Sequence, residues 1–199
     1  MAISYPVALP THTGIAQIEL RAVNAVAYSQ SPFTFAGQAH AYQGQMWQAD
    51  VTLPPMKTAD AEQWLGFLLS LRGRYGTFLL GDPLRTSLRG TATSCTVTGS
   101  AGDNTVSATV TAGQTLLAGD YIQLGSGSTA ALHKVLVNYT GTGSAADLEI
   151  WPALRVARSS ATATISNAKG LFRLNSNEQA WSINEASIYG ITFGAMEAI

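Results

Sequence analysis

Apolar and polar residues alternate with a period of two over much of this chain, and this feature most constrains its fold. Ile18, Leu20 and Ala22 alternate with Glu19 and Arg21. Similar alternation runs through residues 47–53 and 189–193. Successive side chains of an extended strand point to opposite faces, so each run predicts a strand with one buried face. Clusters of Gly, Pro, Asn and Ser separate the runs at short intervals, which favours a mostly β protein built as a sandwich or barrel.

One segment, residues 58–72, follows helical spacing instead. Thr58 is a plausible N-cap, and Asp60 and Glu62 stand in the first turn, where the helix dipole favours negative charge. Gly73 can take the left-handed conformation that ends a helix. The apolar stripe consists of Ala61, Trp64, Leu65, Leu68 and Leu69. We expect this helix to cover the open face of a sheet.

The composition changes sharply near Arg89. Residues 90–168 are rich in Thr, Ser, Ala and Gly, and their only aromatic residues are Tyr121, Tyr139 and Trp151. Short strand-like runs alternate there with turns that contain Gly, Asn or Asp. We interpret this segment as a small all-β module, a β-barrel or a β-sandwich, inserted into a parent domain. The parent is then a β-sandwich with one helix, made from residues 1–89 and 169–199, and an insertion at a surface turn is easy because its ends lie close together.

The residue types that carry catalysis do not form a recognisable pattern. The three histidines, His12, His40 and His133, have no metal-ligand spacing, and His133 lies in a strand-like run that predicts a surface or half-buried position. Cys95 also lies in a strand pattern, without the helix N-terminus or positive charge that activates a thiol, so we expect a buried or half-buried side chain. We therefore predict no catalytic residues, no metal site and no cofactor, and thus not an enzyme.

Charge is scarce, and this limits the partners. Charged residues make up 12% of the chain and the net charge is −1, which gives no electrostatic footprint for duplex DNA or an anionic membrane. No apolar run reaches the ~20 residues of a membrane span, and no signal peptide is visible. A surface with so little charge suits a protein that packs against other subunits. A modest basic cluster, Arg72, Arg74, Arg85 and Arg89, is either a partner contact or ordinary solvated charge.

Several short segments resemble minor tail proteins of long, flexible-tailed bacteriophages, in particular the distal tail proteins at the junction of tube and baseplate. They are WQADVTLPPM at residues 47–56, AEQW at 61–64, GRYGTFLLGDP at 73–83, GDYIQL at 119–124, IWP at 150–152, NEQAW at 177–181, YGITF at 189–193 and the terminal EA at 197–198. The resemblance spans the chain from about residue 30 to its end. In that family the second β module usually lies at the C-terminus, whereas here we infer an insertion.

This resemblance implies a structural virion protein of the phage tail tip, assembled in the host cytoplasm. Its parent domain would form a homo-oligomeric ring, commonly a hexamer and alternatively a trimer, that joins the tail tube protein to the baseplate hub and tape-measure proteins. DNA would pass through the channel without specific binding, and no part would insert into a membrane. On this reading we expect the ring contact at or beside six residues: Trp64, Arg74, Tyr75, Phe78, Tyr189 and Phe193.

The alternative is a receptor- or carbohydrate-binding tail component that uses the inserted module. Sugar sites usually stack an exposed aromatic ring on the pyranose, and Tyr121, Tyr139 and Trp151 are the candidates in this module. Trp151 fits a core position equally well. A tail-associated hydrolase is the third and weakest hypothesis, because no paired nucleophile and base is visible.

Overall fold

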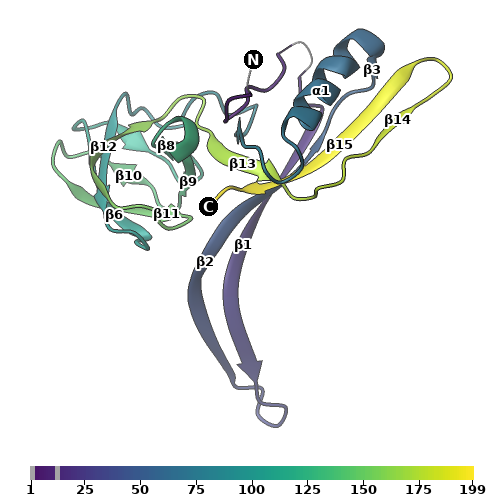
Figure 1. Cartoon of the computed structure of the whole chain (residues 1–199). Helices are drawn as coiled ribbons and strands as arrows, with labels where there is room; N and C mark the ends of the chain where they lie inside the picture. The colour runs from purple at the N-terminus through teal and green to yellow at the C-terminus, as the bar shows by residue number, and fades with distance from the viewer. Residues whose placement is uncertain (1–2, 12–13) are drawn as a thin grey trace.

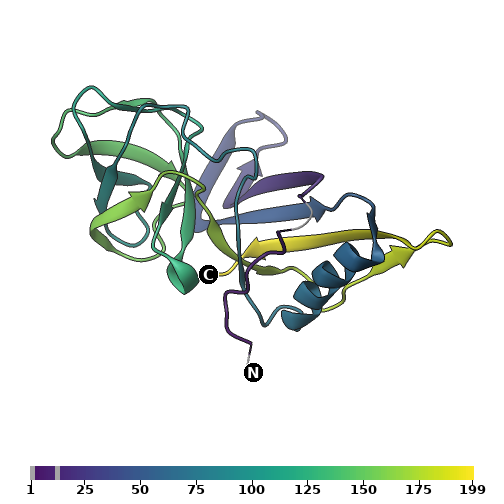
Figure 2. The same ribbon diagram turned by 90° about the horizontal axis from the view of Figure 1, so that it is seen from above.

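The computed structural model describes residues 3–11 and 14–199, which form a bent β-sheet with one helix and, beside it, a closed β-barrel (Figure 1). This arrangement confirms the prediction of a mostly β fold with one α-helix and a small barrel within it. Figure 2 shows the barrel on one side of the sheet's strands and the helix on the other.

The sheet has seven strands, five of them in the order β1-β2-β15-β13-β4, with β14 and β3 both paired to β15. All these pairs are antiparallel. The strands are β1 (Gln17–Gln30), β2 (Gly37–Thr52), β3 (Met56–Lys57), β4 (Phe78–Leu80), β13 (Gly170–Leu174), β14 (Trp181–Ile183) and β15 (Ile188–Glu197). The strand β15 is central because it pairs with four of the others. Its alternating burial matches the alternation in the sequence.

The helix α1 (Thr58–Ser70) packs its apolar face on this sheet. Two details of the helix prediction are wrong. The N-cap residue is Lys57, which makes no side-chain cap, so Thr58 already lies inside the helix. Leu69 is 59% exposed, and Phe67 is buried in its place, because the sheet covers a face centred on Trp64 and Leu68. Gly73 has φ +67°, as expected after a helix end.

The barrel closes in the order β11-β6-β5-β12-β8-β9, and a small ribbon of β7 and β10 lies at its side. Its strands are β5 (Cys95–Gly99), β6 (Thr105–Val110), β7 (Thr115–Leu116), β8 (Tyr121–Leu124), β9 (Ala131–Val135), β10 (Tyr139–Thr140), β11 (Ala146–Trp151) and β12 (Arg158–Thr164), with the short 3-10 helix η1 (Gly127–Thr129) before β9. Aliphatic side chains such as Ile122, Leu124 and Leu148 fill the interior, together with small ones such as Ala108 and Cys95. The barrel core is thus almost free of aromatic rings, which agrees with their scarcity in residues 90–168.

All barrel strands come from within residues 90–168, and all sheet strands lie outside that range. The chain enters the barrel after β4 and returns through β13, two strands that pair with each other. The ends of the inserted segment therefore lie close together. The division into two domains stays a prediction.

Direct contacts join the barrel to the sheet. The guanidinium of Arg155 forms an ion pair with the buried Glu197 at 2.7 Å and also donates to the backbone carbonyl of Gln45. The side chain of Gln45 accepts a hydrogen bond from the backbone N–H of Ala153 at 2.7 Å. Within the sheet, the same carboxylate of Glu197 accepts a hydrogen bond from the backbone N–H of Trp47 at 3.1 Å, which fixes its position for Arg155.

Candidate functional site

Four of the six residues expected at a ring contact lie inside this chain's own core. Trp64, Phe78, Tyr189 and Phe193 are all less than 9% exposed. Phe78 and Phe193 meet edge to face with ring centroids 6.1 Å apart, and Trp64 lies 6.2 Å from Phe193. A side chain buried within one subunit is not available to touch another. The structure therefore assigns these four residues to the aromatic core beneath α1.

The other two residues, Arg74 and Tyr75, lie on the surface after the helix. Tyr75 is 73% exposed and packs edge to face on Tyr5, with ring centroids 5.7 Å apart. Arg74 donates through Nε to the carbonyl of Asn175 at 2.8 Å, so its guanidinium is held by its own chain. The backbone N–H of Arg74 donates to the side chain of Asn177 at 3.1 Å. Of the six, Tyr75 is thus the side chain most open to a partner.

A long uncovered surface belongs to the β1–β2 hairpin, which projects from the body of the molecule (Figure 1). Residues 22–49 contain no Asp, Glu, Lys or Arg, although Arg21 and Asp50 flank them. The hairpin tip carries Phe33, which is 92% exposed, and Phe35, which is 72% exposed. Phe35 also has φ +56°, a left-handed conformation that is unfavourable for a bulky residue.

Neither face of the hairpin's outer half is covered. The register places Val26 and Tyr28 on one face, opposite the small Ala41 and Ala39. The other face carries His40 and Tyr42, whose rings meet edge to face at 4.8 Å. Val26, Tyr28 and Tyr42 are all more than half exposed. An isolated two-stranded hairpin is at best marginally stable in water, and an uncovered apolar surface of this kind is typical of an interaction site.

Sequence reasoning missed this hairpin as a candidate surface. The signal was the absence of charge, because residues 22–49 contain no Asp, Glu, Lys or Arg. The alternation at residues 18–22 and 47–53 marks only the inner ends of the two strands, where one face is buried, and a strand that leaves the body of the molecule has two exposed faces.

Two of the three carbohydrate candidates lie together, and the third does not. Tyr121 and Trp151 line one cavity, of about 390 Å³, between the barrel and the base of the hairpin. Tyr139 is 7% exposed and donates its hydroxyl to the carbonyl of Ala108 at 2.8 Å inside the barrel. Tyr139 is therefore a core residue, because no ligand can reach its ring.

Two tryptophans from different parts of the fold form one wall of this junction cavity. Trp47 comes from β2 and Trp151 from β11, and their rings meet edge to face at 4.5 Å. The indole N–H of Trp47 donates to the carbonyl of Leu132 in the barrel at 2.9 Å. The indole N–H of Trp151 donates to the side-chain oxygen of Asn24 in the hairpin at 2.7 Å. These two hydrogen bonds cross the junction in opposite directions and fix both rings.

The polar groups of the junction cavity are Asn24, Tyr121 and Lys134. The ammonium of Lys134 lies 4.5 Å from the centroid of the Tyr121 ring and donates to its hydroxyl at 3.2 Å. Among the described residues, no carboxylate lines this cavity. The remaining lining residues are apolar: Leu20, Ala22 and Leu136, with the two tryptophans.

The histidines and the cysteine give no catalytic arrangement within residues 3–11 and 14–199. His133 is 1% exposed, which corrects the expected surface or half-buried position, and the carbonyl of Pro152 lies 2.7 Å from its Nδ1. Because a carbonyl only accepts, Nδ1 carries the proton. Burial is the main cause that lowers the pKa of His133 to about 4, with a smaller contribution from the positive charges of Arg155 and Arg158, while the hydrogen bond with Pro152 acts in the opposite direction. Burial raises the pKa of the Cys95 thiol to about 11, which keeps the thiol protonated and inert.

His40 lies on the hairpin beside Tyr42, and His12 lies outside the described residues. Where the structure describes the chain, no three His, Cys, Asp or Glu side chains come together as metal ligands. Of the basic cluster, Arg74 and Arg89 donate to backbone carbonyls, Arg89 to that of Ala118 at 3.1 Å. The guanidinium groups of both arginines therefore form hydrogen bonds within their own chain.

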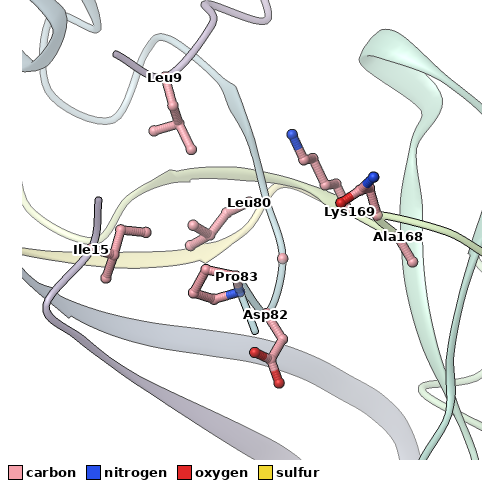
Figure 3. A pocket seen from close by; sticks show the side chains of 9 residues that line it. Leu9, Ile15, Leu80, Asp82, Pro83, Ala168 and Lys169 are labelled. Carbon is pink, nitrogen blue, oxygen red and sulfur yellow. The ribbon is translucent and has the colours of Figure 1, made fainter. Parts of the chain in front are cut away.

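A smaller hollow, of about 210 Å³, lies where the chain passes between sheet and barrel (Figure 3). Leu9, Ile15, Leu80 and Pro83 supply its apolar lining. The charged groups of Asp82 and Lys169 point away from each other in Figure 3. They do not converge on a common point, so the hollow has the character of a packing defect.

No protein-family model matches the sequence, and a search of curated proteins found no match. Within the described residues, no helix is long and apolar enough to cross a membrane.

Proposed function

We propose that this chain is a structural virion protein of the phage tail tip, which forms a closed ring between the tail tube and the baseplate hub. DNA passes through the ring without specific binding, and the protein makes and breaks no bonds. Its partners are further copies of itself, the tail tube protein and the hub and tape-measure proteins. The tail-protein segments quoted above are the basis for the phage assignment.

The single observation that carries the oligomeric part is the charge-free, aromatic-tipped hairpin formed by β1 and β2. Its two exposed faces are too apolar for an arm that stays in water, since interface cores are depleted in charge and enriched in Tyr and Phe. A second copy is the natural occupant, because the scarcity of charge extends over the whole chain. The hairpin of one subunit then lies on the body of the next.

Such a contact joins two different surfaces, so it is heterologous. Heterologous contacts that close produce rings, and closure removes exposed strand edges. A ring of six is the expected assembly, and a ring of three is the alternative.

The hairpin tip provides a direct test. We expect the double variant Phe33→Ser and Phe35→Gly to shift the protein from ring to monomer, because burying each aromatic ring contributes about 2–3 kcal/mol. Glycine is chosen at position 35 because the backbone there has positive φ. The measurement is the molar mass by light scattering over a concentration series.

Val156→Ser is the matched control, since Val156 is also an exposed apolar residue, at 59%, but lies on the barrel segment. It should leave the mass unchanged. A hairpin variant that assembles like the unmodified protein would show that the tip is not the subunit contact. The variant Tyr75→Ser tests the surface behind the helix in the same way, and we expect it to weaken assembly as well.

The alternative is a carbohydrate-binding component that works through the inserted module alone. One of its three candidate residues, Tyr139, is buried in the barrel core and cannot contact a sugar. Its other two candidates, Tyr121 and Trp151, need Trp47 and Asn24 from the parent sheet to complete the cavity. We therefore do not propose the isolated module as a binding unit.

A further inference from the structure

We propose that the junction cavity between barrel and hairpin binds an acidic pyranose, a sugar ring that carries a carboxylate. The cavity combines fixed aromatic walls with hydrogen-bond donors. This inference does not depend on ring formation, because every residue that lines the cavity comes from one chain.

The aromatic walls are held in place before any ligand arrives. Both indole N–H groups are already used, that of Trp47 on Leu132 and that of Trp151 on Asn24. Neither ring can rotate without losing a hydrogen bond across the junction. Trp47 is 4% exposed and packs against the ring of Trp151, so Trp151 and Tyr121, both half-buried, are the rings that a ligand can reach. A preorganised aromatic surface lowers the entropy cost of binding, and the apolar face of a pyranose packs well on it.

The free polar groups of the lining side chains are all donors. The oxygen of Asn24 accepts from Trp151, which leaves its amide N–H₂ without a partner in the described part of the chain. The oxygen of Tyr121 accepts from Lys134, which leaves the phenolic O–H free to donate. The ammonium of Lys134 has further N–H groups, and it forms no ion pair with any described residue.

Such a lining selects a ligand rich in acceptors. The hydroxymethyl group of a neutral sugar adds one more O–H donor, which would find no carboxylate among the described lining residues. A carboxylate offers two acceptor oxygens and compensates the charge of Lys134. The volume of about 390 Å³ lies within the usual range for small-ligand sites.

A pair of probes that differ at one carbon tests the proposal. Methyl β-D-glucopyranosiduronate carries a carboxylate where methyl β-D-glucopyranoside carries a hydroxymethyl group. Titration of the ¹⁵N-labelled full chain with each gives a dissociation constant. The indole N–H signal of Trp151 reports on the junction cavity and that of Trp181, on β14, on a remote surface. We expect the uronide to bind at least about tenfold more tightly and to shift the Trp151 signal and not the Trp181 signal.

Two variants remove single polar groups and keep the aromatic walls. Lys134→Gln should weaken uronide binding about tenfold or more and abolish the preference over the glucoside, and Tyr121→Phe should weaken it by a smaller factor. Lys57→Gln is the matched control, because Lys57 is an exposed lysine on β3 and should change nothing. The dispersion of the NMR spectrum shows whether each variant is folded.

Equal affinity for the two probes, a preference that survives Lys134→Gln, or the absence of any shift at Trp151 would each overturn the proposal. If neither sugar binds and Leu136→Ser lowers the assembled mass, the cavity is a subunit contact and the sugar proposal is wrong. The mass of the unmodified protein is measured separately. If the protein forms a ring but does not bind the uronide, the sugar proposal is wrong and the proposed function stands. If the protein stays monomeric but binds the uronide, the proposed function is wrong and the sugar proposal stands.

Discussion

At the scale of single residues, Asp120 shows how one carboxylate joins the segment that leads into the barrel to a turn of the barrel itself. It is 3% exposed and accepts hydrogen bonds from the backbone N–H groups of Arg89 at 2.7 Å, Gly90 at 3.1 Å and Leu117 at 2.8 Å. Two segments that are remote in sequence are thereby joined just after the chain leaves the sheet. The sequence does not reveal this role, because the partners are backbone groups without a sequence signature.

We predict that Asp120→Asn lowers the free energy of unfolding by about 2–3 kcal/mol, since the amide accepts through one oxygen and loses the negative charge that strengthens these bonds. Chemical denaturation monitored by circular dichroism measures the change. Asp147→Asn is the control, because Asp147 is exposed on β11 and should shift the unfolding free energy by less than about 0.5 kcal/mol. Equal effects of the two variants would contradict the assigned role.

His133 predicts a dependence of stability on pH. Its pKa in the folded protein is about 4, below its ordinary value of 6.5, so the unfolded chain binds this proton more readily. The contribution of His133 is complete above pH 6.5 and is lost as the pH falls toward 4. The loss amounts to at most about 3 kcal/mol.

The variant His133→Gln keeps a hydrogen-bond donor for the carbonyl of Pro152 and removes the titrating ring. The unfolding free energy of the unmodified protein should therefore fall more steeply between pH 6.5 and 4 than that of the variant. Urea denaturation at several pH values gives the difference, and parallel curves would show that His133 does not titrate in this window.

At the scale of elements, the helix shows what the sequence can and cannot predict. The period of 3.6 residues identified α1 and its buried stripe, but the stripe was placed too far toward Leu69. Periodicity gives the direction of an apolar face to within one residue either way, and the choice between Phe67 and Leu69 depends on where the sheet lies. That position is set by Phe78 and Phe193 from distant strands, so no local pattern contains it.

Leu68 and Leu69 form a matched pair on this helix. Leu68 is 2% exposed and Leu69 is 59% exposed, so Leu68→Ala should cost about 2–5 kcal/mol of unfolding free energy and Leu69→Ala less than about 0.5 kcal/mol. Thermal and urea denaturation of the two variants measure the ratio. Similar losses for both would mean that the helix is turned on the sheet relative to the arrangement described.

The strands show the same limit on what periodicity can predict. Alternation located β2 at its inner end and the first half of β15, because there one face packs on the core. The outer half of β1 and β2 has no regular alternation, since residues 25–28 are four apolar residues in a row, so periodicity predicts nothing about it. For the expected ring contacts, the sequence does not distinguish an aromatic residue of the core from one on the surface, and Trp64, Phe78, Tyr189 and Phe193 lie in this chain's own core.

At the scale of the whole molecule, the sheet with its helix, the barrel and the hairpin have different roles. The sheet and helix hold the main core, and the barrel has a separate, mainly aliphatic core. The ion pair of Arg155 with Glu197 and the two indole hydrogen bonds hold the barrel against the base of the hairpin. The β1–β2 hairpin extends into solvent (Figure 1), and it is the part that a neighbouring subunit would complete.

The solution mass of the unmodified protein, measured by light scattering across a concentration series, is the most direct test of ring formation. We expect the mass to rise to a plateau at six times 20.9 kDa, and a plateau at three times this mass is also consistent with a ring. The mass should then stay constant, because a closed ring has no free end. A monomer at every concentration, or a mass that grows without a plateau, would contradict a self-closing ring built through the hairpin.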